Sequence, residues 1–312
     1  MTHHLRSLLL ALALCLLAPL VLAQVRVVIV SSDNTAAYME TVQELMAHLV
    51  REGVSPYEIQ RLSVPEWSVQ PAQKQPPRVY VALGSQATAV LAASPLSAPV
   101  LSALIPRSSF ERVLRTSARK ASSDFTAIYL DQPLQRQLAM VRLALPQAKH
   151  VGVLWGPDSW ASAPALRSLA AANGLSLTEA GLEGNSNVFS DLQQVLSGSD
   201  VLLALADPLV FNSGSVQNIL LSTFRARVPM VAFSPAYVRA GALLALHANP
   251  VHVGRQAAVL VQAALRGQPL PEQPVESNDF EVSVNGHVAR ALNLSLDAKA
   301  LRQALRRQEH LP

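Results

Sequence analysis

The sequence alternates between short apolar runs and amphipathic helical patterns along almost its whole length. The first apolar run covers Val25 to Val30, and the polar turn 31–34 separates it from a helical pattern over 36–51. A nearly continuous apolar run is typical of a strand that is covered on both faces. Strands of this kind that alternate with helices indicate parallel β-sheets with helices on both sides. The predicted fold class is therefore α/β.

The alternation restarts near the middle of the chain, which predicts two lobes of similar construction. Further apolar runs that predict strands cover residues 58–64, 79–83, 99–104, 125–130, 151–155, 175–180, 201–206, 230–233, 242–246 and 280–284. We expect two Rossmann-like lobes with parallel sheets joined by hinge strands, because the chain is long enough for two ordinary domains. Residues 24–128, with about 238–270, are predicted to form lobe 1, and residues 129–237 to form lobe 2. Residues 271–312 bridge the lobes or return to one of them.

The first 23 residues have the pattern of a secretory signal peptide. Arg6 supplies a positive charge, an apolar stretch covers 7–22, and Val21-Leu22-Ala23 is a cleavage site of the small-x-small type. The alternative, an uncleaved membrane anchor, is disfavoured because the apolar stretch is short for a membrane span. We therefore predict a periplasmic protein that is not inserted in the membrane after signal cleavage.

The charge of the chain gives no sign of a nucleic-acid partner. The isoelectric point is about 9.5, but the basic residues are scattered. The densest group is Arg107, Arg112, Arg115, Arg119 and Lys120, within one predicted helix and the segment after it. No aromatic pattern for base stacking accompanies this group, so a solvated helix face is the preferred interpretation.

Sequence motifs for catalysis, nucleotide binding and metal binding are absent. No G-x-G-x-x-G follows a strand, and there is no Walker motif, G-x-S-x-G or H-E-x-x-H. The only cysteine, Cys15, lies in the signal-like stretch, so the mature chain has no thiolate nucleophile or cysteine ligand. We predict no enzyme activity, no cofactor and no metal. The remaining catalytic alternative is an exported enzyme that uses a carboxylate cluster.

Three aspartates, Asp33, Asp158 and Asp207, each follow a predicted strand, and they would form that cluster. An aspartate in a strand-to-helix turn usually caps the helix, so capping is the preferred interpretation for each one alone. In parallel α/β sheets, ligands bind beyond the carboxyl ends of the strands. The three turns are therefore expected to face a common region.

The turn Gly84-Ser85 is the strongest candidate for binding an anionic group. It connects the apolar run 79–83 to a helical pattern, and a helix start has free backbone N–H groups that attract a carboxylate. The alternative is that Gly84 only permits a tight turn. Asp158 or Asp207 would suit an ammonium group, and Trp155, Trp160 and Tyr237 would supply an aromatic wall. The complete set of predicted ligand-binding residues is Ser32, Asp33, Gly84, Ser85, Trp155, Asp158, Ser159, Asp207 and Tyr237.

The stretch SPAYVRAGALLALHANPVHVGRQAAVLVQAALRG, residues 234–267, resembles a signature of bacterial ABC-transporter substrate-binding proteins. The shared features are Gly241-Ala242-Leu243 before a strand and Gly254-Arg255-Gln256-Ala257-Ala258 in a long helix. The tail FEVSVNGHVARALNLSL (280–296) and GVLWGPDSW (152–160) are also similar to that family. The family includes type I periplasmic binding proteins for tryptophan or tyrosine.

The resemblance implies two lobes that close around a small ligand and deliver it to an ABC permease. The ligand class would be an amino acid or a related carboxylate, although the first loop, Ser31 to Thr35, departs from the amino-acid binders. The runner-up function is a periplasmic ligand-sensing subunit that reports to a membrane receptor. The segment AIYLDQPLQR, residues 127–136, falls at the expected first hinge crossing, and no binding role follows from it.

Overall fold

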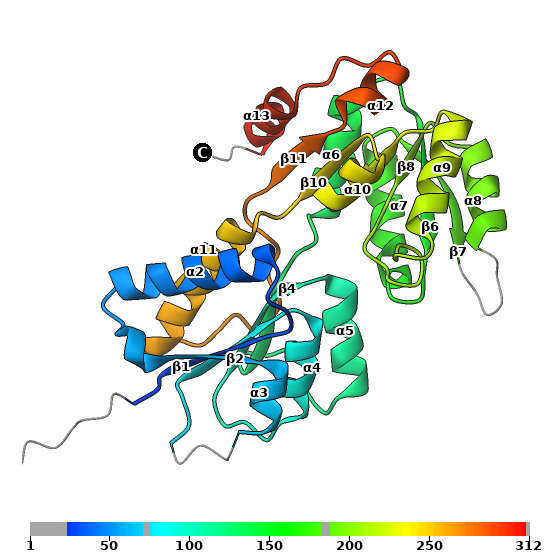
Figure 1. Cartoon of the computed structure of the whole chain (residues 1–312). Helices are drawn as coiled ribbons and strands as arrows, with labels where there is room; N and C mark the ends of the chain where they lie inside the picture. The colour runs from blue at the N-terminus through cyan, green and yellow to red at the C-terminus, as the bar shows by residue number, and fades with distance from the viewer. Residues whose placement is uncertain (1–23, 71–74, 182–187, 310–312) are drawn as a thin grey trace, which may run out of the picture.

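Two separate β-sheets form two lobes in the computed structural model, which describes residues 24–70, 75–181 and 188–309. Figure 1 shows the lobes side by side, with helices on the faces of each sheet. This arrangement confirms the predicted α/β class with two lobes of parallel strands. The predicted signal peptide lies outside the described residues. No helix within the described ranges is long and apolar enough to cross a membrane.

Lobe 1 contains a parallel sheet of five strands in the order β2-β1-β3-β4-β5. The strands are β1 (Val27–Ser31), β2 (Ile59–Ser63), β3 (Val79–Leu83), β4 (Val100–Ile105) and β5 (Phe125–Tyr129). One face packs on α2 (Ala36–Arg51) and α11 (Pro250–Leu265). The other packs on α3 (Val64–Ser68), α4 (Ser85–Ala93) and α5 (Arg107–Thr116). β3, β4 and β5 are buried throughout, which explains why their sequences are apolar without alternation.

Lobe 2 contains six strands in the order β11-β10-β9-β8-β6-β7. The strands are β6 (His150–Trp155), β7 (Ser176–Gly181), β8 (Val201–Leu203), β9 (Met230–Ala232), β10 (Leu244–His247) and β11 (Glu281–Val284). Only β11 is antiparallel to its neighbour. One face packs on α6 (Leu134–Ala144), α7 (Ala163–Ala172), α12 (Gly286–Ala291) and α13 (Ala298–Gln308). The other packs on α8 (Val188–Ser197), α9 (Val216–Ala226) and α10 (Pro235–Ala240).

The chain crosses between the lobes at residues 130–133, 248–249 and 276–280. The first and third crossings start side by side, because Val275 forms a parallel bridge with Ile128 at the edge of lobe 1. The backbone N–H of Val275 donates to Ala127 O at 2.8 Å, and Tyr129 N–H donates to Val275 O at 2.9 Å. The first and third crossings therefore start from hydrogen-bonded neighbours at the edge of lobe 1. Figure 1 shows the chain passing between the two lobes at this junction.

The C-terminal third is divided between the lobes differently from the sequence-based expectation. Residues 238–247 were expected in lobe 1, but β10 pairs with β9 and continues the sheet of lobe 2. Only the helix that follows, α11, lies in lobe 1. Within 271–312, Val275 contacts lobe 1 and β11 joins lobe 2, so this segment bridges the two. An apolar strand such as β10 fits either sheet by composition, and the pairing partner decides its place.

Candidate functional site

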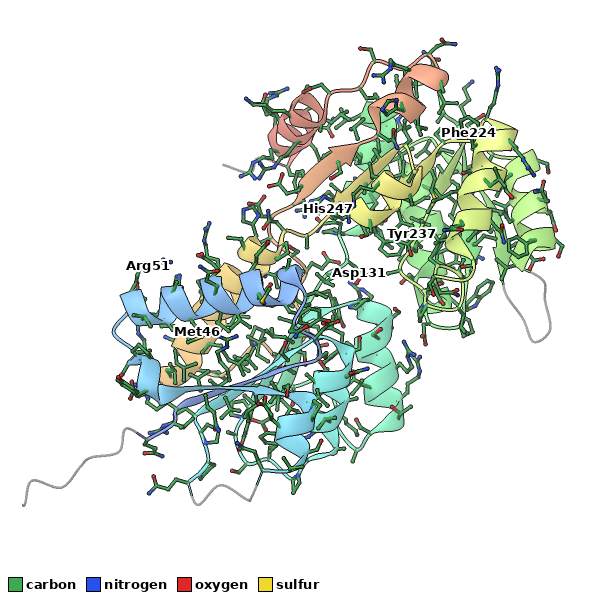
Figure 2. The ribbon with its side chains drawn as sticks, in the orientation of Figure 1. Met46, Arg51, Asp131, Phe224, Tyr237 and His247 are labelled. Carbon is green, nitrogen blue, oxygen red and sulfur yellow. The ribbon has the colours of Figure 1, made fainter. Side chains whose placement is uncertain are left out.

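A cavity of about 490 Å³ lies between the two lobes. Residues at its wall come from lobe 1 (Tyr38, Leu104), from lobe 2 (Phe233, Arg239) and from the crossing at 248–249. Asp131 and His247, labelled in Figure 2, mark the junction of the lobes beside it. This volume is in the range of small-molecule sites in proteins. The cavity therefore offers a place where one ligand would touch both lobes.

Most of the cavity wall is apolar. The apolar lining residues are Ala37, Leu104, Pro106, Leu130, Ala204, Leu205, Ala206, Phe233, Pro235, Ala236, Leu246, Ala248 and Pro250. Many of them follow the carboxyl ends of strands, which is where α/β sheets bind ligands. Alanines and prolines leave room for an apolar group that a wall of larger side chains would exclude.

The polar end of the cavity is formed by the first crossing and the start of α6. Asp131 Oδ2 accepts the backbone N–H of Arg107 at 2.6 Å. Burial raises the pKa of the Asp131 carboxyl, and the Arg107 N–H and guanidinium oppose this shift. Gln137 Nε2 donates to Gln132 O at 2.7 Å, which fixes the turn before α6. The sequence thus places a carboxyl and two amides side by side at the hinge.

Two ionisable side chains of lobe 2 also line the cavity. His247 is already paired, since its Nδ1 lies 3.1 Å from Ala248 O and its Nε2 lies 3.0 Å from Ser283 Oγ. Burial lowers the pKa of His247, so its imidazole is neutral near pH 7. Arg239, in contrast, makes no hydrogen bond or ion pair with any described residue. Its guanidinium is available for an anionic ligand group.

A second cavity, of about 400 Å³, adjoins the first. The two share the wall residues Asp131, Gln132, Gln137, Leu205 and Ala206. The second cavity has a more polar lining that includes Arg107, Glu111, Asp158, Ser159 and Glu276. Arg107 and Glu276 form an ion pair there at 2.9 Å. The first crossing therefore runs between an apolar and a polar compartment.

The lobes are held together beside the second cavity by a charged contact. Asp158 of lobe 2 accepts from Arg115 at 2.7 Å and lies 3.2 Å from Arg112, both on α5 of lobe 1. The Ser108 hydroxyl on the same helix donates to Ala206 O at 3.0 Å. We call these three contacts the α5 clasp. They span the gap between the lobes and favour the arrangement in which the lobes are close.

Replacing Asp158 by asparagine is expected to shift the lobes toward a more open arrangement. Both arginines are about half exposed, so the lost pairing amounts to about 1 kcal/mol, or roughly a fivefold change in the ratio of closed to open molecules. Residues 24–312 contain no cysteine, so cysteines introduced at the exposed Lys120 and Gln193 of this segment allow paired labelling for a distance measurement. High salt should have the same effect on the unsubstituted protein. Asp124→Asn, which removes an exposed charge in lobe 1, is the control, and an unchanged distance in Asp158→Asn contradicts the clasp.

The Gly84-Ser85 turn does start a helix, as the sequence predicted, but the protein itself occupies part of it. Ser32 Oγ accepts the backbone N–H of Ala87 at 2.8 Å. The φ of Gly84 is 85°, and a Cβ there would collide with the Tyr38 hydroxyl. The glycine is therefore required by the turn and by the approach of Tyr38. Neither residue of the turn lines the cavity between the lobes.

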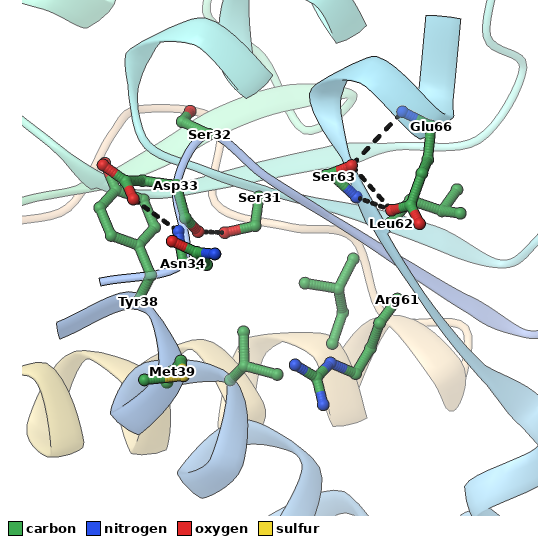
Figure 3. Close-up of a pocket in the computed structure, with 12 residues that line it drawn as sticks. Ser31, Ser32, Asp33, Asn34, Tyr38, Met39, Arg61, Leu62, Ser63 and Glu66 are labelled. Carbon is green, nitrogen blue, oxygen red and sulfur yellow. Dashed lines mark hydrogen bonds between the residues drawn. The ribbon is translucent and has the colours of Figure 1, made fainter. Parts of the chain in front are cut away.

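Asp33 caps its own turn and faces a different pocket. Its Oδ1 accepts the N–H groups of Asn34 at 2.6 Å and Thr35 at 3.1 Å. Ser32 and Asp33 line an open pocket of about 620 Å³ in lobe 1, with Arg61 and Glu66 on the opposite side (Figure 3). Tyr38 lines both this pocket and the cavity between the lobes.

The candidates in lobe 2 mostly serve the fold. Asp207 is 2% exposed and accepts three backbone N–H groups, from Asp158, Ser159 and Leu209. Trp155 is fully buried, and its Nε1 donates to Glu179. Tyr237 donates to Phe211 O at 3.3 Å. Ser159 Oγ accepts the N–H of Gly156, and Ser159 lines the second cavity together with Asp158.

The residues that form the polar end, Asp131, Gln132 and Gln137, are not among those predicted from the sequence. A usable signal was present, because Asp131 and Gln132 are polar residues directly after the apolar run 125–130. The same rule selected Asp33, Asp158 and Asp207. In the sequence, however, polar residues at a hinge crossing look the same as polar residues at a ligand site. Within the parts of the chain described, no group of three or more histidine, cysteine or acidic residues is placed to hold a metal.

Comparison with known proteins places this chain in a protein family. A family model described as ABC transporter substrate binding protein matches residues 27–307. Among curated protein sequences, none matches this chain. Several solved structures share the fold at low sequence identity.

Three solved structures illustrate the similarity. A ligand-free, open substrate binding protein with adhesive properties from Clostridium difficile has a TM-score of 0.66 at 18% identity, covering 87% of this chain and 96% of that one. A conserved domain protein from Vibrio cholerae has a TM-score of 0.61 at 20% sequence identity, and the match covers 88% of this chain and 96% of that one. An ABC domain from Streptococcus pneumonia in complex with L-Trp has a TM-score of 0.60 at 16% identity, and the match covers 88% of this chain and 97% of that one. These similarities establish the two-lobed fold.

Proposed function

The chain belongs to the family of ABC transporter substrate binding proteins, and from this premise we propose that it captures a small ligand between its lobes for an ABC importer. The proposed ligand is an amino acid or a related carboxylate. The proposed site of action is the periplasm, after removal of the signal-like first 23 residues. Binding and release, without catalysis, make up the whole of this function.

The observation that carries the proposal is the cavity whose wall comes from both lobes and from the crossings. A ligand inside it gains contacts with Leu104 of lobe 1 and Phe233 of lobe 2 only when the lobes are close. Binding therefore shifts the population toward the closed arrangement. A membrane partner that recognises both lobes at once would then distinguish the loaded from the empty protein.

The chemistry of the wall supports a ligand with an apolar body and a charged head. The unpaired Arg239 suits a carboxylate, and Asp131 suits an ammonium group. The long helices α2 and α11 begin beside the cavity, where Ala37 and Pro250 of their first turns line the wall, and helix starts favour negative charge. The L-Trp bound to the Streptococcus protein is a ligand of this kind.

A ligand screen by thermal unfolding tests the proposal. The mature protein is purified from the periplasm of an expression host, freed of carried-over ligand by mild unfolding, and screened with amino acids, small carboxylates, purines and sugars. A ligand at about 100 times its dissociation constant should add about 2.7 kcal/mol of stability. We expect clear shifts with one or more apolar amino acids. Shifts with sugars or purines alone would contradict the ligand class.

Delivery to an importer needs a separate test in cells. Uptake of the radiolabelled ligand should fall when the gene is deleted and return when it is restored. Normal uptake combined with the loss of a transcriptional or motility response to the same ligand would instead indicate the sensing function.

A further inference from the structure

Gln132 has a side-chain amide that the protein leaves half-satisfied. The residue is 4% exposed and borders both cavities between the lobes. Its Nε2 is buried and has no hydrogen-bond partner among the described residues. A buried N–H group without a partner costs about 1–3 kcal/mol. Folded proteins therefore rarely keep such a group unless something else pairs with it.

The orientation of this amide is determined by Arg136. Arg136 Nη1 donates to Gln132 Oε1 at 2.7 Å. A guanidinium group only donates hydrogen bonds, so the oxygen of the amide has to face Arg136. The Nε2 group then occupies the other side of the amide and cannot exchange places with the oxygen. The hydrogen bond from Arg136 therefore leaves Gln132 Nε2 as the unpaired donor.

Arg136 is itself held firmly by the third crossing and the C-terminal helix. Its Nε lies 2.8 Å from both carboxylate oxygens of Glu309, at the end of α13, and its Nη1 donates to Ser277 O at 3.2 Å. The guanidinium also lies 4.8 Å from the centre of the Phe280 ring. Arg136 is only 7% exposed. A buried charge with this many partners has little freedom to turn and release Gln132.

The neighbour of Gln132 on the chain offers the complementary group. The Asp131 carboxylate accepts the Arg107 N–H, and the Arg107 guanidinium is engaged with Glu276 and the Tyr129 ring. Gln132 and Asp131 both line the two cavities, so the unpaired donor, Gln132 Nε2, and an acceptor, the Asp131 carboxylate, belong to the same polar end. A matching ligand head has an acceptor oxygen next to a donor nitrogen.

We propose that Gln132 is the specificity-determining residue of the ligand site. Its Nε2 donates to a carboxylate or carbonyl oxygen of a ligand that also carries an amino group, and the pair Arg136–Glu309 positions the amide for this contact. This inference rests on the proposed function. Beyond that function, the inference names the protein group that donates, the ligand oxygen that accepts, and the residues that position the donor.

The variant Gln132→Glu tests the donor. Glutamate keeps an oxygen for Arg136 and replaces the free N–H group by a second acceptor, so the hinge contact stays and the ligand contact is lost. Calorimetric titration is performed with L-phenylalanine and L-leucine and with two analogues of the first, phenethylamine without the carboxylate and 3-phenylpropanoate without the amine. We expect the variant to bind the amino acids about 10- to 100-fold more weakly, the loss of a hydrogen bond to a charged group.

The analogues separate this role from a general weakening of the site. The unsubstituted protein should bind phenethylamine, which lacks the carboxylate, at least about tenfold more weakly than L-phenylalanine. In Gln132→Glu the affinities for these two ligands should differ little, because the contact with the carboxylate is already lost. Gln268→Glu, which adds the same charge at an exposed turn after α11, is the matched control and should bind normally. Equal affinities of Gln132→Glu and the unsubstituted protein for the amino acids would overturn the proposal.

The positioning role is tested by Glu309→Gln, which keeps the size of the side chain and removes its charge from Arg136. We expect a loss of affinity of about three- to tenfold in the unsubstituted background and no further loss in Gln132→Glu. Additive losses would show that Glu309 acts on the site by another route and would contradict the positioning role.

Mass spectrometry of the small molecules that co-purify from the periplasm distinguishes failure of this inference from failure of the proposed function. A purine with a carbonyl oxygen and an amino group that is bound by the unsubstituted protein and lost in Gln132→Glu would support the role of Gln132 while the amino-acid class fails. A bound sugar, which has no donor nitrogen, would overturn both the amino-acid class and the proposed role of Gln132. A ligand retained equally by both proteins overturns the role of Gln132 alone. If neither protein carries or binds any small molecule, the proposed function and this inference fail together.

Discussion

Replacing Gly254 by valine should destabilise lobe 1 by about 3 kcal/mol, the upper part of the range for overpacked sites. Gly254 lies on α11, and a Cβ at this position would lie 2.6 Å from the backbone carbonyl oxygen of Thr41 on α2. The two helices are further tied by the Thr41 hydroxyl, which donates to Pro250 O at 3.0 Å. A backbone atom cannot move aside as a side chain does, so the helices would have to separate.

Urea unfolding of the variants measures the change in the free energy of unfolding. Gly254→Ala tests whether a single added methyl group stabilises or destabilises the protein. Alanine in a helix interior is normally about 1 kcal/mol more favourable than glycine. At Gly254 we expect the reverse, because even one methyl group meets the Thr41 carbonyl. Val259→Ala, on the exposed side of the same helix, should change stability by less than about 0.5 kcal/mol. A stabilised Gly254→Ala protein would contradict the close helix approach.

Replacing Asp207 by alanine is expected to cost about 3–5 kcal/mol and to loosen the contact between the lobes. Its Oδ2 accepts the N–H groups of Asp158 at 3.1 Å and Ser159 at 2.9 Å, and its Oδ1 accepts that of Leu209 at 3.0 Å. Alanine would leave these three donors without a partner, and each buried donor costs about 1–3 kcal/mol. The loop that carries Asp158 would also lose its support, which weakens the α5 clasp.

Chemical unfolding, the distance between labels at Lys120 and Gln193, and ligand titration together measure the effect of Asp207→Ala. Asparagine at position 207 keeps one acceptor oxygen, so Asp207→Asn should lose less stability than Asp207→Ala. A variant of normal stability that no longer binds ligand would show instead that Asp207 contacts the ligand, as the sequence suggested.

The prediction of the fold from the sequence succeeded because the decisive signals are local. β3 and β4 are apolar without alternation because both faces of their sheet are covered, and α2 repeats its apolar residues at helical spacing because one side faces the core. The short helices α3 and α12 were not predicted. They have too few residues to show a period, and their caps, Ser63 and Asn285, are also common in turns.

The candidate site was harder to predict, since a polar residue after a strand has several uses that look alike in the sequence. Asp207 and Asp33 satisfy backbone groups of the protein, Asp158 forms the clasp with α5, and Asp131 lies at the wall of both cavities. The partners of these carboxylates come from segments far away in the chain. Their hydrogen bonds depend on how those segments pack, which no local pattern encodes.

The sequence by itself determined that this protein is built from two parallel α/β lobes, because backbone geometry and burial act over a few neighbouring residues. Only the tertiary structure decided that β10 belongs to lobe 2 while α11 returns to lobe 1, and that Gln132 keeps a free donor between two cavities. Those outcomes depend on strand pairing and on contacts such as that between Arg136 and Glu309, which are 173 positions apart in the chain. Such contacts are decided by the competition among distant partners for the same buried space.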